Sequence, residues 1–279
     1  MNNKHIDRRQ FLQNSLLLST TSLLPISSLA QSRQVSLIGL QLFTLRQEMF
    51  ADFAGTLASV AELGYKEMEF AGYFNRSASE VRHLLEANGL NSPAAHIPLN
   101  RVQSNLQAEI DFAAELGQKF IVVPIVPPEE RSADDYRRHA ETLNRAGEAM
   151  HQAGIRIAYH NHSFEFDDSN DQYPFDILLN ETDPELVDFE LDLYWIVKAG
   201  VDPIPYFEKY PGRFSLLHVK DMNDRGQITE VGSGIIDFPA LFSHEETAGF
   251  QHYFVEHDNP EDGLTSVASS IGGLRSFRF

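Results

Sequence analysis

From Val35 onward, short apolar runs rich in β-branched residues alternate with longer segments of helical periodicity. The alternation repeats about every thirty residues, which is typical of βα units that build a parallel sheet. Eight of the apolar runs are expected to be strands: residues 35–41, 65–70, 94–97, 119–125, 155–160, 187–192, 214–220 and 252–258.

The segments between these runs are expected to be helices, and several begin near Ser or Asp and end at Gly, as helix capping favours. They are residues 52–64, 77–89, 106–117 and 132–154, with 262–277 as the last helix. Eight βα units in about 245 residues match a single-domain α/β fold, the (β/α)₈ TIM barrel. An open doubly wound sheet is the alternative, but no GxGxxG or Walker-type loop follows the first strand.

Side chains alternate between the two faces of a barrel strand, so hydrophobicity indicates which positions point inward. In the fifth strand Ile155, Ile157 and Tyr159 form the helix-facing set, which leaves His160 inward. The same rule points these further residues inward near strand ends: His162, Asp192, His218, Lys220, Glu256 and, less firmly, Asp258.

Four of these residues are predicted metal ligands: His160, Asp192, His218 and Glu256. They follow adjacent strands, and barrel enzymes build their sites at that end. A single Asp there would more simply be a helix cap, and a single His a core residue. Four such residues at the same end of adjacent strands favour a bound divalent cation, because burying several ionisable groups together is unfavourable unless a cation balances them. Two imidazoles and two carboxylates suit Mn²⁺ first, with Zn²⁺, Fe²⁺ or Co²⁺ as alternatives.

The amino terminus differs from the rest of the chain. Arg8 and Arg9 precede a moderately apolar stretch, which ends at the small residues Ser28–Ala30. This pattern resembles a twin-arginine export signal, rather than an ordinary amphipathic first helix. We therefore expect residues 1–30 to be a signal peptide, residues 31–279 to be the barrel domain, and the protein to be periplasmic or otherwise exported.

Charge and composition narrow the partners. The formal net charge of -18 opposes binding to nucleic acid and to anionic lipid surfaces. The absence of cysteine leaves His, Asp and Glu to ligate any metal. No segment is apolar and long enough to predict a membrane span. A neutral small molecule, or one held by a cation, fits this charge better, and a homo-oligomer is left open.

Several sequence blocks resemble the sugar phosphate isomerase/epimerase family, the xylose isomerase-like barrels. They are "YHNHSFEF", "ELDLYWIVKAGVDPIPYFEKYPGRFSLLHVKDM", "VGSGIIDFPALF" and "HYFVEHD", with softer matches in "GLQLFTLR" and "AGYFNRSASEVRHLLEANGL". The resemblance implies a divalent metal at the barrel mouth, held by Asp192, His218 and Glu256. It also implies isomerisation, epimerisation or dehydration of sugars and keto-polyols.

The fifth strand departs from that family, in which many members have a glutamate where this chain has His160. We expect His160 to be the substitute ligand, with Glu165 as the alternative. Family epimerases place carboxylates on both faces of the substrate. Here the second base must be Glu165 or His162, unless the reaction needs only one face. The expected activity is therefore isomerisation or epimerisation of a sugar or keto-sugar by proton abstraction next to a carbonyl, with elimination by a lyase or dehydratase as the alternative.

Roles follow for the other candidates. Glu256 or Glu165 is the expected base, and His162 and Lys220 are expected acid or oxyanion partners. Lys220 could instead form a salt bridge to Asp221 or Asp192. The expected substrate contacts are Gln41, Glu69, His96 and Trp195.

The loop that contains Gly232 and Gly234 follows the seventh strand, where many barrels bind phosphate. The full phosphate signature is missing, so an unphosphorylated sugar is expected. Two other functions remain open: an exported carbohydrate-binding protein without catalysis, and a metal-dependent hydrolase or endonuclease. The charge and the small number of histidines disfavour the second.

Overall fold

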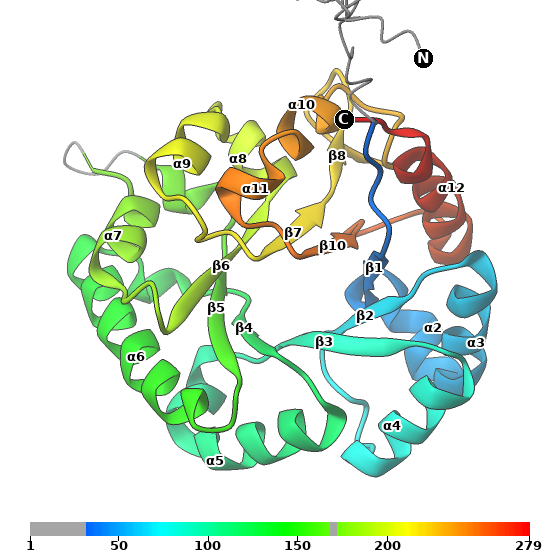
Figure 1. Ribbon diagram of the computed structural model, residues 1–279, viewed down its shortest axis with the longest axis horizontal. Helices are drawn as coiled ribbons and strands as arrows, with labels where there is room; N and C mark the ends of the chain where they lie inside the picture. The colour runs from blue at the N-terminus through cyan, green and yellow to red at the C-terminus, as the bar shows by residue number, and fades with distance from the viewer. Residues whose placement is uncertain (1–31, 168–171) are drawn as a thin grey trace, which may run out of the picture. The chain divides into compact units, whose positions relative to one another are not determined.

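Eight parallel strands close into a barrel in the computed structural model of the protein (Figure 1). The structure describes residues 32–167 and 172–279, so the expected signal segment lies outside the described residues. The strand order around the barrel is β1-β10-β7-β6-β5-β4-β3-β2. The strands are β1 (Ile38–Gln41), β2 (Glu67–Phe70), β3 (Asn91–His96), β4 (Phe120–Val123), β5 (Arg156–His160), β6 (Val187–Asp192), β7 (Leu216–Val219) and β10 (His252–Val255). The predicted barrel and its eight strands are confirmed.

The third strand differs from its predicted bounds. β3 begins at Asn91, before Pro93, whereas the prediction began at Ala94. Proline lacks a backbone N–H and is confined to edge strands, strand starts and bulges, so no strand was predicted across Pro93. The register between β2 and β3 shifts between Glu67 and Glu69, and this irregularity accommodates the proline.

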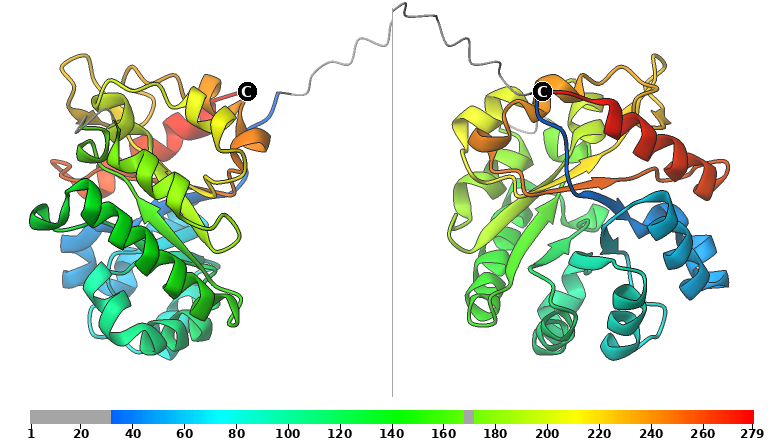
Figure 2. Two further views of the ribbon diagram at one scale, coloured as in Figure 1. Left: turned by 90° about the vertical axis from the view of Figure 1, so that its left-hand side faces the viewer. Right: turned by 45° about the vertical axis from the view of Figure 1, so that its right-hand side comes forward.

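Helices surround the strands, as both views in Figure 2 also show. No helix in the two described ranges is long and apolar enough to cross a membrane. The longer helices are α3 (Phe53–Leu63), α4 (Ala78–Ala87), α5 (Leu99–Leu116), α6 (Ala133–His151), α7 (Pro174–Glu181) and α12 (Gly263–Ser276). The shorter ones are α2 (Arg46–Ala51), α8 (Leu193–Lys198), α9 (Ile204–Lys209), α10 (Phe238–Phe242) and α11 (Glu245–Ala248), with 3₁₀ turns η1 (Leu42–Leu45), η2 (Pro128–Glu130) and η3 (Phe164–Phe166). A small hairpin, β8 (Asp221–Met222) with β9 (Ile228–Thr229), lies outside the barrel.

Local capping explains where two of the helices start. Ser77 and Glu80 form a capping box at α4, and Ser132 and Asp135 form one at α6. In each capping box the two side chains accept hydrogen bonds from two backbone N–H groups at the start of the helix, which have no acceptor within the helix. The predicted starts at Ser77 and Ser132 are therefore correct to within one residue.

The core has two layers, separated by the strands. Residues such as Tyr159, Phe189 and Leu217 pack outward against the helices. A smaller group fills the barrel interior: Ala94, Phe120, Val122, Ala158, Leu216 and Phe254. This division confirms the alternation read from the sequence, and it places His160, Asp192, His218 and Glu256 on the interior side.

We predict opposite effects for two neighbouring glycines of α12. A Cβ on Gly273 would overlap the carbonyl oxygen of Val231, whereas a Cβ on Gly272 meets no heavy atom within 4 Å. Gly273→Ala should lower the free energy of unfolding by about 1–3 kcal/mol, because helix and loop must separate. Gly272→Ala should raise it by about 0.5–1 kcal/mol through helix propensity. Urea denaturation of the two variants checks both, and equal effects would contradict the close helix–loop contact.

Candidate active site

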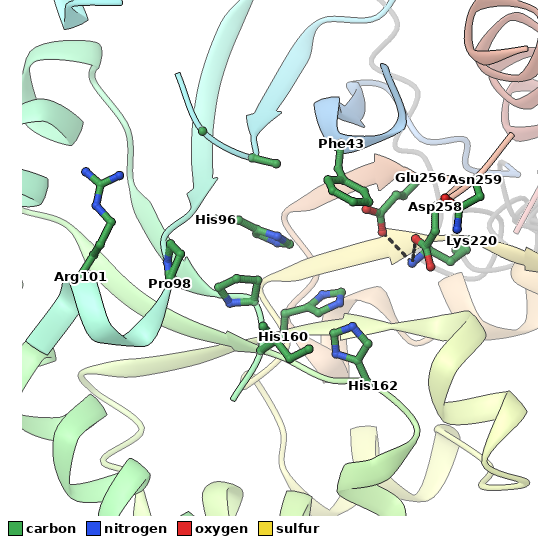
Figure 3. A pocket seen from close by; sticks show the side chains of 14 residues that line it. Phe43, His96, Pro98, Arg101, His160, His162, Lys220, Glu256, Asp258 and Asn259 are labelled. Carbon is green, nitrogen blue, oxygen red and sulfur yellow. Dashed lines mark ion pairs between the residues drawn. The ribbon is translucent and has the colours of Figure 1, made fainter. Parts of the chain in front are cut away.

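A cavity of about 590 Å³ opens at the carboxyl ends of the barrel strands (Figure 3). Its walls come from the carboxyl ends of seven strands, all but β6, and from the segments that follow them. The lining residues that carry ionisable or polar groups are His96, Arg101, His160, His162, Lys220, Glu256, Asp258 and Asn259, with Phe43, Pro98, Pro124 and Ile125 among the others. This volume and this mixture of apolar wall and convergent polar groups are typical of a small-molecule site.

Glu190 is the centre of a hydrogen-bonded group of histidines on the floor of this cavity. Its Oε2 lies 2.7 Å from His96 Nε2, 3.1 Å from His160 Nδ1 and 3.1 Å from His218 Nε2. Glu190 itself is fully buried. One carboxylate oxygen therefore fixes the ring orientation of three imidazoles from three different strands.

Glu190 is not among the residues predicted from the sequence, because the prediction for the sixth strand included only its last inward position, Asp192. The same alternation places Glu190 inward one layer deeper, because side chains two residues apart share a face. The signal was therefore present in "VDFELD".

His218 faces a different carboxylate with each ring nitrogen. Nδ1 lies 2.7 Å from Glu256 Oε2 and 3.8 Å from Asp192 Oδ2. Nε2 lies 2.7 Å from Glu69 Oε2, beside its contact to Glu190. Such backing carboxylates commonly orient a histidine whose other nitrogen binds a metal.

Asp192 combines two roles, one structural and one at the site. Its Oδ1 accepts a hydrogen bond from the Trp195 amide and caps α8. Its Oδ2 faces the cavity cluster, 3.9 Å from His160 Nε2. The cap that a single Asp predicts is thus present without removing Asp192 from the cluster.

Lys220 joins the acidic residues of the site. Its Nζ lies 2.8 Å from Asp192 Oδ2, 2.7 Å from Glu256 Oε2 and 2.7 Å from Asp258 Oδ1. Dashed lines in Figure 3 mark the pairs to Glu256 and Asp258. Of the two salt bridges considered as alternatives for Lys220, the structure shows the one to Asp192. Asp221 points elsewhere.

The four predicted ligands do converge, but not equally. Asp192, His218 and Glu256 can each offer an atom within 4.8 Å of the others. The corresponding atoms of His160 group with His96, Glu190 and His218. Because Glu190 already unites that second set by hydrogen bonds, the first set is the better metal site, with His160 Nε2 next to it.

The donor set fits a divalent cation. In the described part of the chain, two buried carboxylate oxygens of this cluster, Glu69 Oε1 and Glu190 Oε1, lack a hydrogen-bond partner. A third, Asp192 Oδ2, has the Lys220 ammonium 2.8 Å away. Five carboxylates meet here, those of Glu69, Glu190, Asp192, Glu256 and Asp258, and among the described residues Lys220 is the one lysine or arginine that pairs with them. Such an excess of buried negative charge requires protons or a metal to balance it.

The pKa values of the cluster reflect this imbalance. Burial alone would lower the pKa of His218, but Glu190 and Glu256 outweigh it and hold the pKa well above 6.5. Burial raises the pKa of Asp192 to about 6, although Lys220 acts in the opposite direction. Burial and the neighbouring charge of Glu190 raise the pKa of Glu69 to about 7. The cluster therefore holds protons that a free carboxylate would have released.

Two predicted substrate contacts lie beneath the cavity floor instead of lining it. Gln41 donates from Nε2 to Glu69 Oε2 over 2.8 Å, and its Oε1 accepts from the Phe43 amide. Both Gln41 and Glu69 are fully buried, and Glu69, held by Gln41, contacts His218 Nε2. His96 does line the cavity. Trp195 packs against the site, with its ring 5.7 Å from Lys220 Nζ, but it is not a lining residue.

Glu165 is the clearest difference from expectation, because the structure does not bring it to the cluster. Its Oε1 accepts from the Tyr159 hydroxyl and its Oε2 from the His162 amide, both over 2.7 Å. Tyr159 faces the helices, so Glu165 lies behind the fifth strand and supports the turn that carries His162. This placement fits neither the predicted base nor the alternative ligand. His162 itself lines the cavity, with Nδ1 buried and without a hydrogen-bond partner.

Asp221 organises the loop after the seventh strand. Its Oδ2 accepts from the amides of Gly232 and Gly234, and its Oδ1 from those of Met222 and Ile236. Converging loop amides are a common anion site in proteins. Here the protein's own buried carboxylate fills that position.

Comparisons with known proteins agree with this architecture. The model of the "Xylose isomerase-like TIM barrel" family matches residues 57–276. An inosose dehydratase of Lacticaseibacillus casei is 23% identical over 231 residues, covering 69% of this chain and 77% of that protein. A solved sugar phosphate isomerase/epimerase from Parabacteroides distasonis superposes with a TM-score of 0.75 at 30% identity, over 90% of this chain and 96% of that one. The IOLI protein, solved with a zinc atom, has a TM-score of 0.69 at 15% identity, over 85% and 95% of the two chains.

Glu165 should make stability depend on pH. Burial raises its pKa from 4.5 to about 7, against the hydrogen bonds from Tyr159 and His162. Between these pH values the unfolded chain releases the proton while the folded protein keeps it. The contribution of Glu165 to the free energy of unfolding therefore falls as pH rises from 4.5 to 7, and stays low above that. Glu165→Gln cannot ionise, so wild type should lose about 2–3 kcal/mol relative to this variant between pH 5 and pH 8.

Urea denaturation of wild type and Glu165→Gln at pH 5 and pH 8 measures this change in their stability difference. Any hydrogen bond that the substitution removes costs the same at both pH values and therefore cancels. Tyr159→Phe is the matched control, since it removes a hydrogen bond to Glu165 but keeps the carboxyl group and hence the pH dependence. A stability difference between wild type and Glu165→Gln that is the same at pH 5 and pH 8 would contradict the assignment.

Proposed function

Because the chain belongs to the xylose isomerase-like TIM barrel family, we propose that it is a divalent-metal-dependent enzyme that dehydrates a keto-sugar or keto-polyol. It would remove the proton next to the carbonyl and expel a hydroxyl group from the neighbouring carbon. The comparisons support the coarser statement, that the protein is a sugar-modifying enzyme of isomerase or lyase type.

One observation favours elimination over epimerisation: the lining carboxylates lie on one side of the cavity. Glu256 and Asp258 both follow β10. Figure 3 shows them beside Lys220, with His96, His160 and His162 apart from them. An epimerase needs a base on each face of the substrate, whereas elimination needs one base and a group that assists the departing oxygen.

We assign the roles as follows. Glu256 is the proposed base, since it lines the cavity. Burial would raise its pKa, but Lys220 and His218 outweigh this and keep the pKa well below 4.5, so Glu256 is ionised. The Lys220 ammonium, 2.7 Å from it, would donate a hydrogen bond to an oxygen on which charge develops. His162, with its unpartnered Nδ1, would bind a substrate hydroxyl.

Asp192, His218 and Glu256 are the residues that would hold the metal, with His160 adjacent. A bound divalent metal would supply Lewis-acid polarisation of the carbonyl group. Mn²⁺ is the first choice for this mixed nitrogen and oxygen donor set, and Zn²⁺, Fe²⁺ or Co²⁺ are the alternatives.

The substrate we propose carries no phosphate. The amides of Gly232 and Gly234, in the loop where many barrels bind phosphate, are already bonded to Asp221. Arg101 and Lys220 are the arginine and lysine that line the cavity among the described residues, and both are paired with carboxylates. A dianionic group would therefore find no free cation there.

We also propose that residues 1–30 direct export through the twin-arginine route. The twin Arg8–Arg9 pair and the small residues that end at Ala30 support it. Isomerisation or epimerisation at the same site, and carbohydrate binding without catalysis, remain the alternative functions.

The proposed reaction can be tested in deuterated water with a panel of keto-polyols, keto-sugars and aldo-sugars, each with its phosphorylated counterpart where one exists. We expect the metal-loaded protein to release water from an unphosphorylated ketone, giving an unsaturated product visible by ultraviolet absorbance and mass spectrometry. Glu256→Gln should lower the rate by about 10²–10⁴-fold. Glu67→Gln, at the other end of the barrel, is the matched carboxylate control and should retain activity.

Other outcomes of that experiment would identify another function. Deuterium incorporation without loss of water would indicate an isomerase or epimerase. Sugar binding without exchange at any carbon would indicate a binding protein.

Metal titration tests the ligand set separately. Asp192→Ala and His218→Ala should weaken Mn²⁺ and Zn²⁺ binding by more than about 100-fold, because removing a ligand costs more than removing its hydrogen-bond partner. Glu165→Ala should bind metal like wild type, since its carboxylate lies behind the strand. Isothermal titration calorimetry measures both. Loss of binding in Glu165→Ala with retention in Asp192→Ala would contradict the assigned site.

A further inference from the structure

The Lys220 ammonium contacts the same oxygen atoms that the proposed metal would need. Lys220 is almost completely buried, and two of its three partners are Asp192 Oδ2 and Glu256 Oε2. Both residues belong to the set that can offer atoms to one ion. A lysine side chain and a divalent cation therefore compete for the same part of the site.

The competition has a physical basis in charge and burial. A buried carboxylate without a counter-charge is unfavourable, and so is a buried ammonium. The low dielectric of the interior strengthens their attraction, so separating them costs free energy. Two cations sharing the same two oxygens would repel each other at short range. The metal can bind well only if the ammonium gives up those oxygens.

Asp258 gives the ammonium another partner. Its Oδ1 lies 2.7 Å from Lys220 Nζ, and its side chain is 21% exposed, whereas those of Asp192 and Glu256 are buried. Asp258 belongs to neither of the groups that could hold an ion. An ammonium that kept this one ion pair would remain neutralised without occupying the inner oxygens.

We propose that Lys220 is a built-in counter-ion that sets the metal affinity of this site. Without metal it neutralises Asp192 and Glu256 and keeps the cluster formed. When metal binds, it yields those two carboxylates and keeps its pair with Asp258. This inference rests on the proposed function in one respect, the identity of the metal site.

Two consequences distinguish this role from that of an ordinary structural salt bridge. The lysine weakens metal binding, so its removal strengthens it, although Lys220 itself stabilises the metal-free protein. Asp258 supports metal binding only through Lys220, so its effect must vanish when the lysine is absent.

Calorimetric titration of Mn²⁺ and of Zn²⁺ into wild type, Lys220→Met, Asp258→Asn and the double variant tests both consequences. We expect Lys220→Met to bind metal at least about tenfold more tightly than wild type. Asp258→Asn should bind it several-fold more weakly, and in the Lys220→Met background the same change should have no effect. The melting temperature of metal-free Lys220→Met should fall below that of wild type, and metal should raise it more than it raises that of wild type.

The inference is overturned if folded Lys220→Met binds metal with equal or lower affinity than wild type. It is also overturned if Asp258→Asn weakens binding equally with and without Lys220, because Asp258 would then contact the metal directly. Should Lys220→Met fail to fold, the Asp258→Asn arm decides, and unchanged affinity there overturns the inference. Absence of metal binding in all four proteins would overturn the proposed metal site itself, a result distinct from the other three.

Discussion

The gathering of five carboxylates, four of them buried, at one end of the barrel is the constraint on which the site depends. Glu69, Glu190, Asp192, Glu256 and Asp258 meet within contact of one lysine and a group of imidazoles. Burial opposes ionisation of the first four of these groups, so the cluster is stable only with matched counter-charges. The raised pKa of His218, which burial alone would lower, is the direct sign of that demand.

The barrel supplies the geometry that meets this demand. Glu190 occupies the layer beneath the cavity and contacts three imidazoles at once. Glu69, held by Gln41, contacts the same nitrogen of His218. These deeper residues do not line the cavity. They fix the positions of residues that do, and the proposed proton transfer depends on such fixed positions.

Strand alternation predicted much of this arrangement, because successive side chains within a strand point to opposite faces. It placed His160, Asp192, His218 and Glu256 on the interior face, and the structure shows them there. It could not predict the path of the chain after a strand ends. Glu165 lies in the 3₁₀ turn η3, where alternation no longer applies, and its carboxylate turns back to Tyr159. Alternation could not predict how deep a residue lies in the barrel either. Gln41, Glu69 and Glu190 point inward as their strand positions require, but alternation does not say which interior layer lines the cavity.

The distribution of charge across the cavity then limits the chemistry. His96 and His160 each lie with one nitrogen against Glu190, so their hydrogen-bonding capacity is partly committed to the floor. The lining carboxylates all follow one strand, β10. Proton removal on that face has a carboxylate as acceptor, whereas no described residue that lines the other face carries a carboxylic acid to return the proton. In the proposed elimination the departing hydroxyl group needs a proton to leave as water. The Lys220 ammonium can give that proton and regain one from Glu256, which has taken the proton from carbon. The lysine that balances the acidic cluster is thus placed to assist the proposed elimination.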